Sequence, residues 1–181
     1  MAIDTTGWRA TVVSGNPKPA SRTGGVAVAL ARTLLGEGGT EEDVTLVELS
    51  QLTSGLFVWG DPDVAQAKAA VLGADVLVVA SPVYKASFTG LLKAFLDQFG
   101  ADELDCLATV PVMLGGAPVH ALAPEGQLRP VLVEIGASMP TRSLFVVDSS
   151  LDTLDEQLAS WSGRYREALL AVAAVRRTRR G

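Results

Sequence analysis

The sequence predicts an α/β fold, a three-layer sandwich in which one five-stranded parallel sheet, in strand order 2-1-3-4-5, has helices on both faces. Two observations predict it. Short runs rich in β-branched residues alternate with helix-like segments along the whole chain, and right-handed strand–helix–strand connections build a parallel sheet. The strand segments are apolar at nearly every position, which is typical of strands covered on both sides. The chain has 181 residues, so we expect one domain spanning residues 1–181.

The first half of the chain contains three of the expected strands and two helices. Ala10–Ser14 is a short apolar strand, and a loop of Gly, Pro and Asn separates it from the Ala-, Val- and Leu-rich helix Gly24–Leu35. Val44–Leu49 is the second strand. A helix is expected from Pro62 to Leu72, because a proline in the first turn with an aspartate before it is typical of a helix start. Val76–Ala80 is uninterruptedly apolar, which predicts a central strand.

The second half continues the alternation. Thr89–Phe99 is expected to be a helix, and Val110–Leu114 a strand that ends at a pair of glycines. Leu128–Ile135 is the next helix, and Ser143–Val147 is the fifth strand. The chain closes with the long helix Asp155–Val175.

Composition excludes several classes of function. With 15 basic and 20 acidic side chains the formal net charge is -5, so we expect no nucleic-acid partner. A single cysteine, Cys106, and a single histidine, His120, cannot build a Cys/His zinc site, and we expect no metal site. The sequence has no signal peptide and no apolar stretch of roughly 18 residues, which predicts a cytoplasmic protein without a membrane partner. The basic residues at 176–181 are expected to be a frayed, solvated helix end rather than a binding patch.

The candidate site is expected beyond the carboxyl ends of the strands, near the switch point between the first and third strands. The loop after the first strand reads SGNPKPASRT and leads into a helix. Its small residues, hydroxyl groups and one arginine, together with the N–H groups of the helix start, suit a phosphate. The competing interpretation is an ordinary connection in which Ser21 or Thr23 only caps the helix. The residues with the chemistry for a phosphate are Ser14, Ser21, Arg22 and Thr23.

The loop after the third strand begins SPVYKASFT. Pro82 ends the strand, and Val83 and Tyr84 place apolar and aromatic surface at the edge of the sheet. Backbone groups of such a loop can hydrogen-bond a polar heterocycle that Tyr84 covers, so the loop is a candidate seat for a flat ring. The alternative is that Tyr84 only completes the core edge and that Lys85 is a solvated surface cation.

The loop after the fourth strand reads LGGAPVHALAPEG. The pair Gly115 and Gly116 lets the backbone approach a ligand with no Cβ in the way. His120 is expected to be a structural or loop hydrogen-bonding residue, because the chain has no second histidine and no convincing nucleophilic serine. We therefore expect no catalytic acid, base or nucleophile.

The three loops together resemble the NAD(P)H-dependent FMN reductases of the flavodoxin-like superfamily, and more closely the reductase components of two-component alkanesulfonate-type monooxygenases. The similarity covers about Thr11 to Phe145, and its most specific stretch is SPVYKASFTGLLKAFLD. NPKPASRT and GGAPVHALAPEGQLRPVL support it. The resemblance implies that the FMN phosphate is held by Ser14, Asn16, Ser21, Arg22 and Thr23. It implies that the isoalloxazine is lined by Pro82, Val83, Tyr84 and Lys85, with Gly115 and Gly116 at its other edge.

The sequence departs from the family pattern at three positions. Asn16 stands where the family usually has serine, and Leu114 replaces the usual threonine before the glycine pair. Gly126 stands where some sulfonate-type relatives carry an inserted tyrosine that goes with loose flavin binding. The resemblance therefore implies tighter FMN binding in this chain.

The resemblance implies an NAD(P)H:FMN oxidoreductase, in which hydride passes from NADPH or NADH to FMN while the protein stacks the two rings and excludes water. Reduced FMN would then be supplied to a flavin-dependent monooxygenase. A homodimer or homotetramer is also expected. The apolar helix residues Leu91, Leu92, Phe95 and Phe99 are candidates for the subunit contact, although packing on the sheet explains them as well.

Two other functions stay open at this point. A flavoprotein that keeps FMN as a prosthetic group would reduce quinones, azo compounds or metal ions. A flavodoxin-type electron carrier is less favoured, because such carriers usually show a stronger acidic surface and a Thr-rich phosphate loop. The sequence does not distinguish NADPH from NADH.

Overall fold

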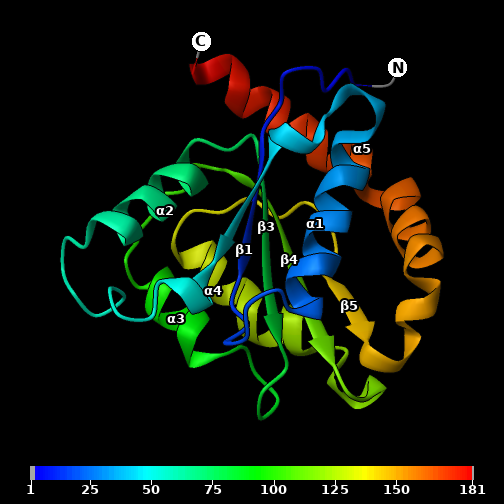
Figure 1. Ribbon diagram of the computed structural model, residues 1–181. Coiled ribbons are helices and arrows are strands. Elements are labelled where there is room, and N and C mark those ends of the chain that lie inside the picture. Colours follow the sequence, from blue (N-terminus) through cyan, green and yellow to red (C-terminus); the bar gives the residue numbers. More distant parts are fainter. Residues whose placement is uncertain (1–2, 181) are drawn as a thin grey trace.

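The computed structural model describes residues 3–180 and contains one parallel sheet, in the order β2-β1-β3-β4-β5, between two layers of helices (Figure 1). The strand order and the layers predicted from the sequence are confirmed. The strands are β1 (Ala10–Ser14), β2 (Val44–Glu48), β3 (Val76–Pro82), β4 (Ala108–Gly115) and β5 (Leu144–Val147). The α-helices are α1 (Arg22–Leu35), α2 (Pro62–Leu72), α3 (Gly90–Leu96), α4 (Arg129–Glu134) and α5 (Leu154–Arg180).

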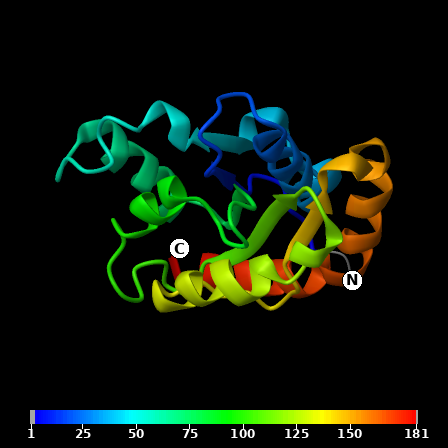
Figure 2. The same ribbon diagram turned by 90° about the horizontal axis from the view of Figure 1, so that it is seen from below.

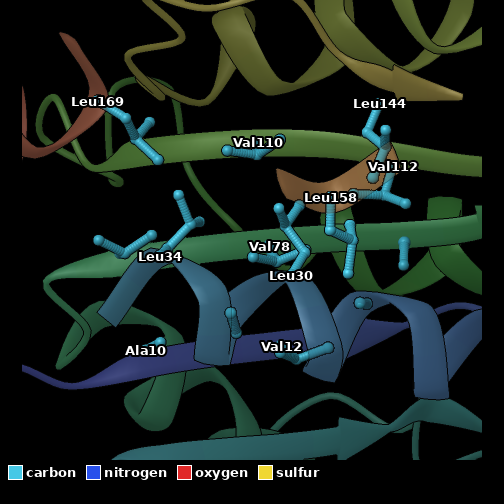
Figure 3. Close-up of a cluster of buried hydrophobic side chains, with 14 of the residues drawn as sticks. Ala10, Val12, Leu30, Leu34, Val78, Val110, Val112, Leu144, Leu158 and Leu169 are labelled. Atoms are coloured by element: carbon cyan, nitrogen blue, oxygen red, sulfur yellow. The ribbon is translucent and has the colours of Figure 1, made fainter. Parts of the chain in front are cut away.

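Each face of the sheet buries its own apolar cluster, because successive side chains of a strand point to opposite faces. Ala10 and Val12 of β1 pack with α1 and α5, as Figure 3 shows for Leu30 and Leu34 of α1. Val13, the residue after Val12, packs with α2 and α3 on the other face. β3 and β4 are buried along almost their whole length, as their uniformly apolar sequences predicted.

One strand and two helices have ends that differ from the expected ones, because of strand pairing or of helix capping. β4 begins at Ala108 instead of Val110, because Ala108 and Thr109 pair with β3 in parallel register. α3 is shorter than the expected Thr89–Phe99, with Thr89 as its N-cap. α1 begins two residues before the expected Gly24, because Ser21 already caps it.

The helix expected at Leu128–Ile135 is α-helical only over Arg129–Glu134. The preceding turn, Pro124–Leu128, is π-helical. Pro130 has no N–H to donate to the preceding turn, so regular α-helical hydrogen bonding cannot run unbroken through this segment.

The basic C-terminal segment is helical, and the prediction of a frayed end is wrong for its described part. α5 continues to Arg180, and the side chain of Arg176 is only 4% exposed. Arg176 donates from Nη1 to the carbonyl of Ala74 at 2.7 Å and from Nε to the carbonyl of Asp105 at 3.1 Å. These carbonyls lie far away in sequence, so the local pattern could not reveal them. Gly181, the last residue of that prediction, lies outside the described residues.

Among residues 3–180, no helix is both long enough and apolar enough to cross a bilayer.

Candidate functional site

A cavity of about 320 Å³ lies where β1, β3, β4 and β5 end, at the edge of the sheet that faces the viewer in Figure 2. It brings together six of the predicted site residues, three from the α1 start, Asn16 before it, and two from the end of β3. The cavity is lined by Asn16, Lys18, Pro19, Ala20, Ser21, Arg22, Thr23, Pro82, Tyr84, Leu114 and Asp148. The predicted site residues Ser14, Val83, Lys85, Gly115 and Gly116 are not in its lining.

The loop between β1 and α1 is held by its own polar side chains. Ser21 Oγ accepts from the N–H of Gly24 at 3.2 Å, so Ser21 is the N-cap of α1. Asn16 Nδ2 donates to Thr23 Oγ1 at 3.0 Å, and Asn16 Oδ1 accepts from the N–H of Lys18 at 3.0 Å. The first N–H groups of a helix have no partner within it. The start of α1 therefore presents donors to the cavity in addition to being capped, and the two interpretations of this loop are compatible.

Ser14 lies at the end of β1 beneath this loop and is only 1% exposed. Its hydroxyl has no hydrogen-bond partner among the described residues. A Cβ placed on Gly24 would lie 3.4 Å from Ser14 Oγ, so the hydroxyl sits directly beside the first turn of α1. Buried hydroxyls normally have a partner. An oxygen-rich anion bound at the helix start would supply one.

Two carboxylates contact the loop between β1 and α1 or the first turn of α1. Asp148 Oδ2 lies 3.6 Å from Arg22 Nη2 at the rim of the cavity. Glu48 Oε1 accepts from the N–H of Ala20 at 2.9 Å, which fixes the loop where Ala20 takes a left-handed φ of 49°. Neither acid was expected from the sequence. Their positions could have indicated them, because Glu48 is the last residue of β2 and Asp148 directly follows β5, so both lie at the carboxyl edge of the sheet.

The loop after β3 is a tight hairpin that projects beyond the lower edge of the sheet (Figure 1). Tyr84 and Ser87 exchange backbone hydrogen bonds of 2.8 and 3.0 Å. Lys85 and Ala86 between them both have positive φ, 51° and 64°. Tyr84 is 49% exposed and lines the cavity, so it does not complete the core edge. Lys85 is exposed at the tip of the turn.

Replacing Ala86 with glycine is expected to stabilise the protein by about 0.5–1 kcal/mol, because an L-residue pays a steric cost at positive φ that glycine avoids. Denaturant unfolding measures the change. The matched control is Ala117→Gly, at an extended residue with φ of -153°, where glycine should only lower stability. A loss of stability in Ala86→Gly similar to that of the control would contradict the prediction.

The hairpin and the β1 loop are tied together through Thr89. Its Oγ1 donates to the carbonyl of Gly15 at 2.6 Å and accepts from the N–H of Leu92 at 3.1 Å. Gly15 approaches α3 so closely that a Cβ there would lie 2.6 Å from Leu92 Cβ. The N–H of Thr89 also donates to Ser81 Oγ at 3.1 Å. From the sequence Thr89 is expected only as a helix start, because its contact with Gly15 depends on the tertiary fold.

The glycine pair after β4 serves two different purposes. A Cβ on Gly115 would lie 2.9 Å from Phe145 Cζ, so this glycine is required by packing within the chain. Gly116 has open space around it, where a ligand edge could approach. His120 ends a short 3-10 turn, and its backbone N–H donates to the carbonyl of Ala117 at 3.2 Å.

The comparisons with known proteins agree on one family. The profile of the family described as NADPH-dependent FMN reductase matches residues 8–152. The chain is 34% identical over 173 residues to the NADH-dependent FMN reductase SfnE of Pseudomonas putida, covering 90% of this chain and 88% of that one. It is 34% identical over 140 residues to an FMN reductase (NADPH) of Pseudomonas putida, covering 77% and 71%. The solved apo structure of the NADH:FMN oxidoreductase EMOB is similar, with a TM-score of 0.78 at 32% identity and 89% of both chains covered.

Proposed function

The chain belongs to the NADPH-dependent FMN reductase family, and from this premise we propose that FMN binds in the cavity at the carboxyl edge of the sheet. The protein is an oxidoreductase that uses NAD(P)H and FMN. The observation that carries the proposed site is that one cavity of about 320 Å³ is lined both by the start of α1 and by the end of β3. One end of it has donors for a phosphate, and the other has an aromatic residue.

The donor set at the α1 end fits the FMN phosphate. Ser14 Oγ is buried without a partner among the described residues and lies beside the first turn of α1, where helix N–H groups have no partner within the helix. Arg22, 68% exposed at the rim, can swing its guanidinium onto phosphate oxygens. We propose that the phosphate is held by Ser14, Asn16, Ser21, Arg22 and Thr23.

Tyr84 and Pro82 also line the cavity, and Tyr84 can cover one face of the isoalloxazine. Gly116 offers an open approach to the other edge of the ring. We propose that Val83 and Lys85 complete this side, with Gly115 shaping it through its contact with Phe145. When bound, FMN would supply the hydride-accepting chemistry, so these residues would only bind the flavin, align the two rings and exclude water.

We propose that reduced FMN leaves this site for a partner monooxygenase. The site as one chain forms it is open, with Tyr84 at 49% exposure. Exchange of flavin through this opening requires no rearrangement of the core. Two of the three relatives compared above are named for NADH and one for NADPH, and either nucleotide is a candidate here.

Homodimers or homotetramers are also proposed, but on a different surface from the helix face expected. Leu92, Phe95 and Phe99 are buried within the chain's own core. Large apolar side chains are exposed in two other loops instead, Phe57 and Trp59 at 87% each before α2, and Val119 and Leu122 after β4. Such exposure is typical of contact surfaces. Light scattering that reports a monomer at micromolar concentration would count against assembly.

The test of function is oxidation of NADPH and NADH by the purified protein, followed by nicotinamide absorbance with and without FMN. We expect turnover that requires added FMN. A yellow protein that oxidises the nucleotide only with a quinone would instead mean that FMN is a prosthetic group. If neither acceptor supports turnover, the proposed function is lost.

A further inference from the structure

We propose that Asp148 is an internal competitor of the FMN phosphate: it pairs with Arg22 in the free protein, lowers the affinity for FMN and so favours its release. The inference rests on the proposed function, because it concerns the same cavity. The inference adds Asp148 as a residue that lowers the affinity of the site for FMN. Asp148 lines the cavity together with Arg22, Ser21 and Thr23.

The geometry makes the Arg22–Asp148 contact easy to displace. The two groups meet through one N–O contact of 3.6 Å, and their side chains are 68% and 38% exposed. Exposed pairs of this kind are weak and gain little from one fixed geometry. Arg22 is the only hydrogen-bonding or ion-pair partner of the Asp148 carboxylate among residues 3–180. A phosphate at the α1 start would therefore take over Arg22 and leave Asp148 unpaired.

Glu48, the other acid beside the loop, has a different role. Its two carboxylate oxygens accept hydrogen bonds from the N–H of Ala20 at 2.9 Å and from Gln51 Nε2 at 3.3 Å. It is thus fixed as part of the loop and does not hold the cation. Asp148 alone combines a position in the cavity lining with an ion pair to Arg22.

Charge gives the sign of the effect. A phosphate monoester carries nearly two negative charges at neutral pH. A carboxylate in the same cavity repels it and also neutralises the arginine that should attract it. Removing the carboxylate charge should therefore strengthen binding of FMN and leave riboflavin, which has no phosphate, unaffected.

Two other roles predict different results. If Asp148 holds Arg22 in the pose that binds phosphate, its loss weakens FMN binding alone. If its carboxylate accepts a hydrogen bond from a ribityl hydroxyl, its loss weakens binding of both flavins. The comparison of FMN with riboflavin separates these roles from competition.

The experiment measures dissociation constants of FMN and riboflavin by flavin fluorescence for the wild type and for Asp148→Asn. We expect FMN to bind about three- to tenfold more tightly to the variant, with riboflavin unchanged. The matched control is Asp152→Asn, which removes the same charge from an exposed residue in the turn after β5, outside the cavity lining. In an Arg22→Gln background, the gain from Asp148→Asn should shrink, because the competition acts through Arg22.

Unchanged or weaker FMN binding in Asp148→Asn overturns the inference. So does a gain that appears equally with riboflavin or with Asp152→Asn. If the wild type binds no FMN at all, the proposed function fails and the inference with it. If the wild type binds FMN and Asp148→Asn changes nothing, only the inference fails.

Discussion

Replacing Arg22 with glutamine is expected to raise the dissociation constant of FMN about 10- to 100-fold, because charge-assisted hydrogen bonds to a phosphate are lost from the α1 start. The affinity for riboflavin should stay the same. Among residues 3–180, Arg22 is the one arginine in the lining of the cavity, and it lies in the first turn of α1, where we place the phosphate. Fluorescence titration of both flavins measures the change.

The matched control for Arg22→Gln is Arg32→Gln, near the other end of α1. Arg32 is also exposed and paired with an acid, Glu41, at 3.0 Å. Both variants lose one positive charge from the same helix, so a general charge effect would appear in both. Equal affinities for FMN in the wild type and in Arg22→Gln would remove the phosphate site from the α1 start.

Replacing Arg176 with methionine is expected to lower the free energy of unfolding by about 2–3 kcal/mol, because three backbone carbonyls lose a donor, and only two of them, those of Leu72 and Ala74, keep a second donor in Arg180. The guanidinium donates to the carbonyls of Leu72, Ala74 and Asp105, at 3.4, 2.7 and 3.1 Å. Leu72 is the last residue of α2 and Ala74 follows its C-cap, and the last carbonyls of a helix have no donor within the helix. Burial lowers the pKa of Arg176 from its ordinary value, with the neighbouring Arg180 as the next cause.

Denaturant unfolding of Arg176→Met is compared with Arg179→Met, an exposed arginine of the same helix end. The control should change stability by less than about 0.5 kcal/mol. Arg176→Lys should fall between the two, because an ammonium cannot reproduce a planar fork that reaches three carbonyls. Equal stability of Arg176→Met and Arg179→Met would mean that the buried guanidinium does not anchor α5.

The fold was predictable from sequence because its signals are local. β1 begins and ends at the residues expected, Ala10 and Ser14, since the apolar run and the loop of Gly, Pro and Asn after it mark the strand. The start of α2 was likewise predicted to the residue, because Asp61 caps the helix and Pro62 is its first residue. The burial of Arg176 was missed, because it depends on carbonyls about 70 to 100 positions away in sequence.

The loop residues of the candidate site could be predicted from the sequence, but the acidic residue beside them could not. Asn16, Ser21, Arg22 and Thr23 were expected together because they are neighbours in sequence, and the cavity does contain them. Asp148 was missed, because only the sheet order places the end of β5 near the start of α1. Tight FMN binding was expected from Gly126 alone. The Arg22–Asp148 pair favours weaker FMN binding instead.

The most direct test of the central claim compares FMN with riboflavin as substrates of the wild-type protein, with NADPH or NADH in excess. Recognition of the phosphate at the α1 start predicts a kcat/KM for FMN at least about tenfold above that for riboflavin. Equal kcat/KM values for the two flavins, or no turnover with FMN, would contradict the account.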